Sequence, residues 1–167
     1  MSANDLRIVT PSGRSLHTMQ FVTVSGGAAI SAGEPVKINT NGLKAYYVVV
    51  IADGDGADGS MYFIGITANS ATHTSSADGT VDVYLHQPGT IYAAKPKTAD
   101  SANTLAKVKA RHWYRVVLDV TSSKFTIDSE ATDAATNAVV IVGGNPDSDE
   151  FYFTVAHPVT WFDWGNR

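Results

Sequence analysis

The stretch Asp78-Gly79-Thr80-Val81-Asp82-Val83-Tyr84-Leu85-His86 indicates most clearly which kind of fold this chain adopts. Side chains along a β-strand point alternately to opposite faces, so Val81, Val83 and Leu85 would share one face and the residues between them the other. The Asp-Gly pair at the start suits the positive φ angles of a type I′ hairpin turn. The stretch therefore predicts a half-buried strand, Thr80–His86, that follows a tight turn.

Runs of the same kind recur along the chain, rich in Val, Ile, Thr, Tyr and Phe and each closed by Gly, Pro, Asn or Asp. The other predicted strands are Met19–Val24, Pro35–Asn39, Leu43–Ile51, Met61–Thr67, Thr90–Ala94, Trp113–Val120, Lys124–Asp128, Ala138–Val142 and Glu150–His157. Short strands joined by turns in this number favour a small barrel or a sandwich.

Local features refine this prediction. The apolar residues of Glu150–His157 lean to both faces, which indicates a strand that is covered on both sides. A second type I′ turn is expected at Asn41-Gly42, and the run Gly143-Gly144-Asn145-Pro146 is expected to interrupt any ladder. Helix is scarce, and its two candidates are Ser101–Arg111 and Asp128–Thr136.

The first 18 residues lack the apolar repeat that would anchor them to a core, so we interpret residues 1–18 as an extended arm. One β-rich domain follows at residues 19–167, with a possible subdivision near residues 95–105. The predicted fold is all-β: a small β-barrel or sandwich of short antiparallel strands, with an extended N-terminal arm and at most one or two short helices.

Composition excludes several classes of function. Of the 167 residues, 44% are hydrophobic and 17% charged, which is enough apolar material to build a core. The net charge of −4 gives no general attraction to nucleic acid or to anionic lipid, so we expect neither partner. Cysteine is absent, which excludes disulfides and thiolate chemistry. Without a signal-peptide core or a run of about 18 apolar residues, we expect a protein that is made and kept in water.

The acidic loop at residues 53–59 matches two binding motifs only in part. It contains G-x-G-x-x-G, but dinucleotide binding needs a helix after that turn, and here a strand is predicted. It also resembles a calcium loop, although Ile64 stands where an EF-hand carries its bidentate Glu. A simple acidic turn is the preferred interpretation, and a loose calcium site at 53–59 stays the alternative.

Candidate catalytic residues find no support in their surroundings. Ser31 lies one residue short of a nucleophile elbow, yet the Glu-Pro pair behind it favours extended chain over the helix that the elbow needs. The five histidines lack the spacing that often places two imidazoles on one metal. Asp147, Asp149 and Glu150 lie in a turn and are interpreted as solvated charge rather than as a glycosidase pair. We predict no catalytic residue, no metal and no cofactor, and hence a protein that is not an enzyme.

Aromatic residues gather near the C-terminus at Trp161, Phe162 and Trp164. Such rings pack in cores and in subunit or partner interfaces, and this is the preferred interpretation. Stacking against a sugar or a nucleobase is the alternative.

Three motifs occur in order along the first half of the chain. They are Ala32-Gly33-Glu34-Pro35-Val36, then Ile64-Gly65-Ile66-Thr67, then Asp78-Gly79-Thr80-Val81-Asp82-Val83 with Pro88-Gly89-Thr90-Ile91-Tyr92. With them, residues 19–94 resemble the small β-barrel decoration, or cement, proteins of tailed-bacteriophage heads. In that family the first motif starts a strand, the second crosses the core, and the last pair closes the barrel.

The resemblance implies a virion protein, made in the host cytoplasm, that binds the outer surface of an expanded capsid and stabilises it. Its partners would be the major capsid protein and itself, as a homotrimer. The arm would order on the capsid, and its removal would weaken binding and leave the fold intact. The arm residues expected to contact the capsid are Asp5, Leu6, Arg7, Ile8, Val9, Pro11 and Arg14.

Residues 101–167 depart from the shorter members of that family and are interpreted as an added β-subdomain or an elaboration of the barrel. A second hypothesis is a carbohydrate-binding β module of a phage tail fibre or surface protein, with Trp161, Trp164, Tyr46 or Tyr47 as stacking platforms. A third is an enzyme with a serine or carboxylate site.

Overall fold

The structure is a computed structural model that describes residues 6–9, 15–39, 47–51, 63–87, 89–97, 104, 106–108, 113–119, 124–129 and 139–155. These residues form eleven strands and no helix, which confirms the predicted all-β class. The strands are β1 (Arg7–Val9), β2 (Thr18–Thr23), β3 (Pro35–Ile38), β4 (Val48–Val50), β5 (Phe63–Thr67), β6 (Gly79–Leu85), β7 (Ile91–Ala94), β8 (Trp113–Asp119), β9 (Lys124–Asp128), β10 (Val139–Asn145) and β11 (Glu150–Val155).

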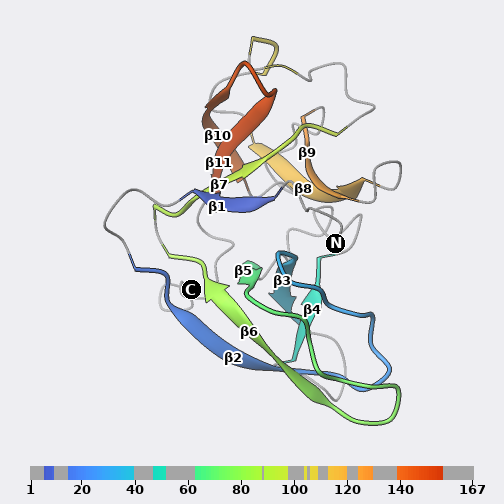
Figure 1. The fold of residues 1–167 in the computed structure, drawn as a ribbon. Coiled ribbons are helices and arrows are strands. Elements are labelled where there is room, and N and C mark those ends of the chain that lie inside the picture. Colours follow the sequence, from blue (N-terminus) through green and yellow to red (C-terminus); the bar gives the residue numbers. More distant parts are fainter. Residues whose placement is uncertain are drawn as a thin grey trace, which may run out of the picture.

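The strands divide into a closed barrel, in the order β2-β4-β3-β5-β6, and a six-stranded sheet, in the order β1-β7-β11-β10-β8-β9. Figure 1 shows the barrel in its lower half and the sheet above it. The chain starts in the sheet at β1, builds the barrel, and returns to the sheet at β7. The four strands after residue 101 therefore share a sheet with the N-terminal strand and do not elaborate the barrel.

The strand β7 does not close the barrel, contrary to what the family resemblance implied. β6 closes it instead, by pairing antiparallel with β2 over six positions from Thr18↔Tyr84 to Thr23↔Gly79. β7 lies between β1 and β11 in the sheet. Its residues Tyr92, Ala93 and Ala94 are all buried, so both of its faces are covered, as expected of a strand inside a sheet.

One threonine holds the turn before β3 against β5. Thr67, at the end of β5, donates its hydroxyl to the carbonyl oxygen of Ser31 at 2.6 Å and accepts the N–H of Glu34 at 3.0 Å. Its own carbonyl oxygen accepts the N–H of Gly33, whose φ of +84° suits glycine. Two of the three motifs therefore meet in space and set how β3 enters the barrel.

Gly65 lets β5 lie close to β6. Its φ is +153°, and a Cβ atom at this position would collide with the carbonyl oxygen of Tyr84 in β6. Only glycine adopts such a backbone in such a space without strain. The glycine of the second motif is therefore required by strand packing.

The two halves have different cores. The barrel core consists of aliphatic residues, among them Val36, Val48, Ile64, Val81 and Val83. The sheet core is richer in aromatic residues and includes Tyr92, Tyr114, Phe125, Phe151 and Phe153. Burying each such ring stabilises the fold by about 1.5–3 kcal/mol.

The strand β11 is fully covered on one face only. Phe151, Phe153 and Val155 are buried, whereas Tyr152 and Thr154 on the other face are half-buried. The prediction of cover on both sides was therefore correct for one face and too strong for the other.

The strand β10 runs through the glycines that were expected to interrupt it. Gly143, Gly144 and Asn145 stay paired with β11, and the register shifts between Ile141 and Gly143. A bulge of this kind places one extra residue in a strand without ending the ladder. The prediction was wrong because glycine weakens a strand but does not prevent pairing with a strongly apolar neighbour.

Two other local predictions, the hairpin turn at Asp78-Gly79 and the helix at Ser101–Arg111, differ from the described structure. Gly79 begins β6 without a positive φ, because residues 68–78 form a longer connection than a hairpin turn. Glycine is needed at this position because a Cβ would collide with the backbone of His73. Within 101–111, the described residues make one turn, in which the N–H groups of Lys107 and Val108 donate to the carbonyl oxygen of Thr104.

The turn expected at Asn41-Gly42 lies outside the described residues, as do residues 130–136 of the second candidate helix. Asp128, where that helix was expected to begin, is instead the last residue of β9.

The substitution Gly65→Ala should lower the free energy of unfolding by about 2–4 kcal/mol, because it forces a side chain into the β5–β6 contact at a strained φ. Gly143→Ala is the matched control, since a Cβ at Gly143 has no atom within 4 Å. Denaturant unfolding followed by circular dichroism measures both. Equal losses for the two variants would contradict the role assigned to Gly65.

Candidate functional site

The predicted arm is anchored to the sheet over part of its length. Leu6 is 3% exposed in the sheet core, and β1 pairs antiparallel with β7 from Arg7↔Ala93 to Val9↔Ile91. A run of three strand residues is too short to show periodicity, which is why no anchor was predicted. Removal of residues 1–18 would take away an edge strand and a core leucine, so the structure leads us to expect a less stable fold after this deletion instead of an unchanged one. Asp5, Pro11 and Arg14 lie outside the described residues.

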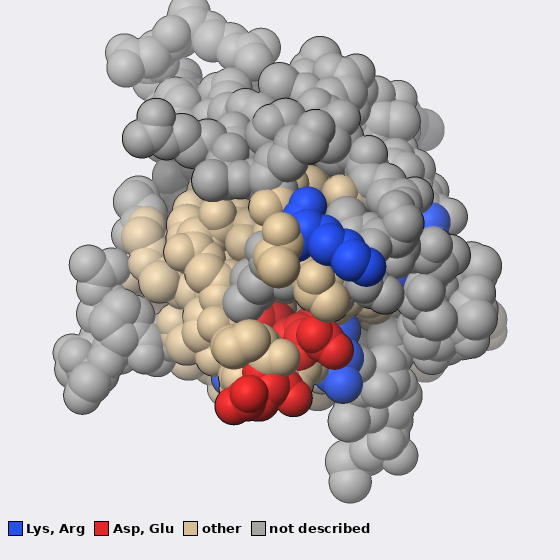
Figure 2. All heavy atoms as spheres, turned by 90° about the horizontal axis from the view of Figure 1, so that it is seen from above, with Lys and Arg blue, Asp and Glu red and all other residues tan. Residues whose placement is uncertain are grey.

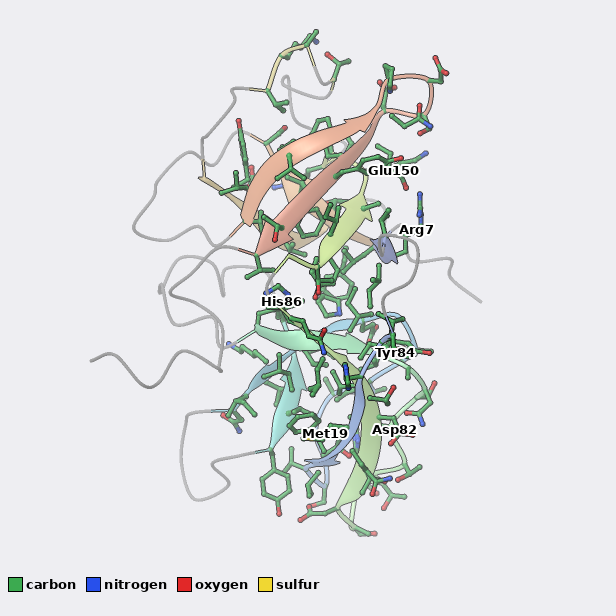
Figure 3. The ribbon with its side chains drawn as sticks, turned by 90° about the vertical axis from the view of Figure 1, so that its left-hand side faces the viewer. Arg7, Met19, Asp82, Tyr84, His86 and Glu150 are labelled. Atoms are coloured by element: carbon green, nitrogen blue, oxygen red, sulfur yellow. The ribbon has the colours of Figure 1, made fainter. Side chains whose placement is uncertain are left out.

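An ion pair ties β1 to β11 across β7. The Arg7 guanidinium donates to both carboxylate oxygens of Glu150, from Nε at 3.2 Å and from a terminal nitrogen at 2.7 Å. Glu150 is 13% exposed by its side chain and Arg7 54%. Figure 3 shows the two side chains side by side at the sheet. One of the seven predicted capsid-contacting residues therefore already has an internal partner.

The turn between β10 and β11 forms an acidic end of the molecule. Asp147 and Asp149 are exposed in it, and Asn145 Oδ1 accepts the N–H of Asp147 at 3.0 Å. Figure 2 looks onto this end and shows acidic side chains gathered in one group. Among the residues described, no group of three His, Asp or Glu side chains could hold a metal ion.

Exposed apolar residues gather along β2. The described residues contain four exposed large hydrophobic side chains, and Leu16, Met19 and Val22 lie within one stretch of seven residues, whereas Val142 lies in β10. We refer to Leu16, Met19 and Val22 as the β2 strip. Residues 15–23 contain no Asp, Glu, Lys or Arg. Met19 is opposite the buried Val83 and Val22 is opposite Thr80, so these two side chains lie on different faces of β2. The β2 strip is thus a set of exposed apolar side chains on both faces of an uncharged strand, in a chain with a net negative charge.

Among the described residues, the backbone of β2 has a partner on both edges only at its end. β2 pairs with β6 over its whole length but pairs with β4 only at Thr23↔Val48. Before Thr23, its second edge has no partner strand in the part of the chain that the structure describes. Exposed edges are commonly protected by charges, prolines or bulges, and none of these occurs in β2. An edge of this kind can bind another protein through backbone and apolar contacts.

A polar network holds the surface beside the β2 strip. Asp82 accepts hydrogen bonds from Asn69 Nδ2 at 2.7 Å and Gln20 Nε2 at 3.4 Å, and its N–H donates to Asn69 Oδ1 at 2.9 Å. Figure 3 shows Met19, Asp82 and Tyr84 on the barrel, away from the ion pair on the sheet. Asn69 thereby holds the connection between β5 and β6 against β6, and Gln20 links β2 to the same carboxylate.

The barrel and the sheet meet at a cluster of aromatic rings around His86. His86 is 3% exposed, and its Nδ1 lies 2.9 Å from the hydroxyl of Tyr92. Phe63 of β5 packs edge-on against both rings, and Tyr92 stacks on Phe153 at a centroid distance of 5.5 Å. Figure 3 shows His86 between the two halves. The alternation along β6 placed His86 on the outer face of the strand. Its burial was not predicted, because the sheet that covers this face is formed by distant parts of the sequence.

Burial controls the protonation of this pair. It lowers the pKa of His86 to about 4 and raises the pKa of Tyr92. At neutral pH the Tyr92 hydroxyl keeps its proton and can donate it to Nδ1 of a neutral His86. The two halves are therefore joined by an uncharged contact.

Several predicted site residues lie outside the described part of the chain: the loop at 53–59, Tyr46, Trp161, Phe162 and Trp164. Tyr47 is described, and its hydroxyl donates to the Asp78 carboxylate at 2.8 Å.

In the residues that are described, no helix is long and apolar enough to cross a membrane. No protein-family model matches this sequence, and no curated protein is similar enough to count as a match.

The free energy of unfolding should fall as the pH drops from about 6.5 to about 4. The unfolded chain protonates His86 near pH 6.5 and the folded chain only near pH 4, so the contribution is complete above 6.5 and is lost below it. The loss should reach about 3 kcal/mol at most. Denaturant titrations at several pH values measure it, and His86→Gln should lack this component. A parallel pH profile for the variant would contradict the assignment.

Proposed function

We propose that this protein is a capsid decoration protein, which binds the outer surface of an expanded tailed-phage head and stabilises the shell. The observation that carries the proposal is the β2 strip, whose exposed apolar side chains stand in a stretch without Asp, Glu, Lys or Arg. The order of the three motifs, whose strands β3, β5 and β6 are neighbours in one small barrel, gives additional support.

The chemistry of the β2 strip fits binding to a protein surface. Covering the exposed area of Leu16, Met19 and Val22 on association is favourable in proportion to the apolar area removed from water. Because β2 carries no charge, covering it removes no ion from solvent, and that cost is avoided.

The proposal includes a homotrimer and the major capsid protein as partner, as the resemblance implies. The arm would reach the capsid from the edge of the sheet, where β1 is held by its pairing with β7 and the Arg7 side chain is exposed. Stapling of this kind acts through contact area and needs no bond-making residue.

Val22→Lys should reduce binding to expanded heads at least tenfold, because it places a charge in the apolar contact. Val142→Lys is the matched control, an exposed valine in β10 that should bind like the unchanged protein. Co-sedimentation with expanded empty heads and with unexpanded procapsids measures binding. Saturable binding to expanded heads alone supports the proposal, and no binding to either would overturn it.

Arg7→Ala should weaken binding to expanded heads severalfold, because it removes a predicted capsid contact as well as the internal ion pair. Glu150→Ala removes only the ion pair and should leave binding unchanged. Each variant should lose no more than about 1 kcal/mol of stability, since the Arg7 side of the pair is exposed to solvent. Equal effects of both variants on binding would mean that Arg7 acts only within the protein.

A further inference from the structure

The sheet contains a complete binding site for residues 6–9. β1 pairs with β7 over three residues, so the strand ladder fixes its register. Leu6 is buried in the sheet core, Ile8 packs against the same core, and Arg7 donates to both carboxylate oxygens of Glu150. Apolar anchors, a charged anchor and a strand ladder thus recognise four consecutive residues. We refer to the sheet surface that holds them as the β1 site.

The strand pairing and the ion pair of β1 both involve the sheet. The pairing is with β7, the ion pair is with the first residue of β11, and no described pairing joins β1 to a strand of the barrel. The barrel and the sheet are joined without β1, by the short connection between β6 and β7 and by the contacts of the Tyr92 ring with Phe63 and His86. The link from β1 to β2 is therefore not needed to hold a barrel on its own sheet.

The link between β1 and β2, residues 10–17, is long enough to reach another copy of the chain. Eight extended residues span at most about 26–29 Å, which is close to the diameter of a small domain. The described end of the link, residues 15–17, is exposed to solvent. The link can therefore run to the sheet of a neighbouring copy as well as to the sheet of its own.

A homotrimer needs a contact surface other than the β2 strip, which the proposed function assigns to the capsid. Among the residues described, Val142 is the one further large hydrophobic side chain that is exposed. Stable contacts between identical subunits bury large and mostly apolar areas. Exchange of β1 would supply such a contact, because it places the apolar anchors of one copy in the core of the next.

We propose that β1 is exchanged between copies of this chain, so that residues 6–9 of one copy occupy the β1 site of the next. Each copy gives one strand and receives one, and the exchange closes into a ring when three copies surround a threefold axis. Arg7 of each copy then donates to Glu150 of its neighbour, through the hydrogen bonds already described. The inference rests on the self-association in the proposed function and is independent of capsid binding.

A disulfide can report which copy β1 pairs with, because the chain has no cysteine of its own. Val9 and Ile91 are directly opposite in the β1–β7 ladder, and cross-strand partners lie at a separation that a disulfide spans. The full-length double variant Val9→Cys/Ile91→Cys is oxidised without capsid and run on a denaturing gel without reductant. We expect covalent trimers, in which each disulfide joins two copies.

Val140→Cys/Thr154→Cys is the matched control, because these two residues are opposite in the β10–β11 hairpin and pair within one copy. It should give monomers. Monomers without free thiols in the Val9→Cys/Ile91→Cys variant would overturn the exchange, and so would free thiols, since β1 would then lie on β7 of neither copy. Light scattering and co-sedimentation test the trimer and capsid binding separately, so a protein that is trimeric or binds heads but gives covalent monomers would refute the exchange alone.

Leu6→Ala should raise the protein concentration at which the trimer dissociates at least about tenfold, because it removes an anchor between copies. Ile64→Ala is the matched control, since it shortens an equally large aliphatic side chain in the barrel core. It should lower stability and leave that concentration unchanged. Sedimentation velocity at several concentrations measures dissociation, and circular dichroism checks that both variants fold. Equal dissociation of the two variants would mean that Leu6 stays within its own copy and would overturn the proposal.

Discussion

The contact of Tyr92 with Phe63, His86 and Phe153 is the interaction on which the whole arrangement depends. Phe63 begins the barrel strand β5 and His86 directly follows the barrel strand β6, whereas Tyr92 and Phe153 lie inside the sheet. Ile51 and Ile66 of the barrel side also belong to the sheet core. The barrel and the sheet are therefore packed on one another as parts of one folded unit, and the uncharged state of His86 is a condition for that packing.

This junction also explains why the N-terminal strand belongs to the fold. The chain must leave the sheet before it builds the barrel and must return to it afterwards, so β1 and β7 lie side by side at the point of return. β1 has only three residues. Its position is supported by Leu6 in the core and by the two hydrogen bonds of the Arg7–Glu150 ion pair. Local sequence would not hold so short a strand in place.

Sequence patterns predicted ten of the eleven described strands, all but β1, because alternation and turn residues are local properties of the chain. Lys124–Asp128 was predicted to the residue, and the described end of Leu43–Ile51 contains β4. The partners of each strand were not predictable in this way: β7 looked like a barrel strand, and His86 looked like an outward residue, because the covering layer comes from distant sequence. The β2 strip was missed for a similar reason. Its residues resemble those of any half-buried strand, and only their surroundings in the fold show that they are exposed.

The strand β2 passes from one environment to another within a few residues, and this is the strongest physical argument about function. At Thr23 it is completely buried and pairs on both sides, whereas Leu16, Met19 and Val22 expose apolar side chains to solvent. A chain that only needed a stable barrel would gain from a charge in that stretch, since charged edges resist unwanted pairing. The absence of any charge from residue 15 to residue 23 costs protection against aggregation, and this cost is offset only when a partner covers the strand. The exposed apolar side chains and the lack of charge in β2 thus support the proposed binding of another protein surface to this strand.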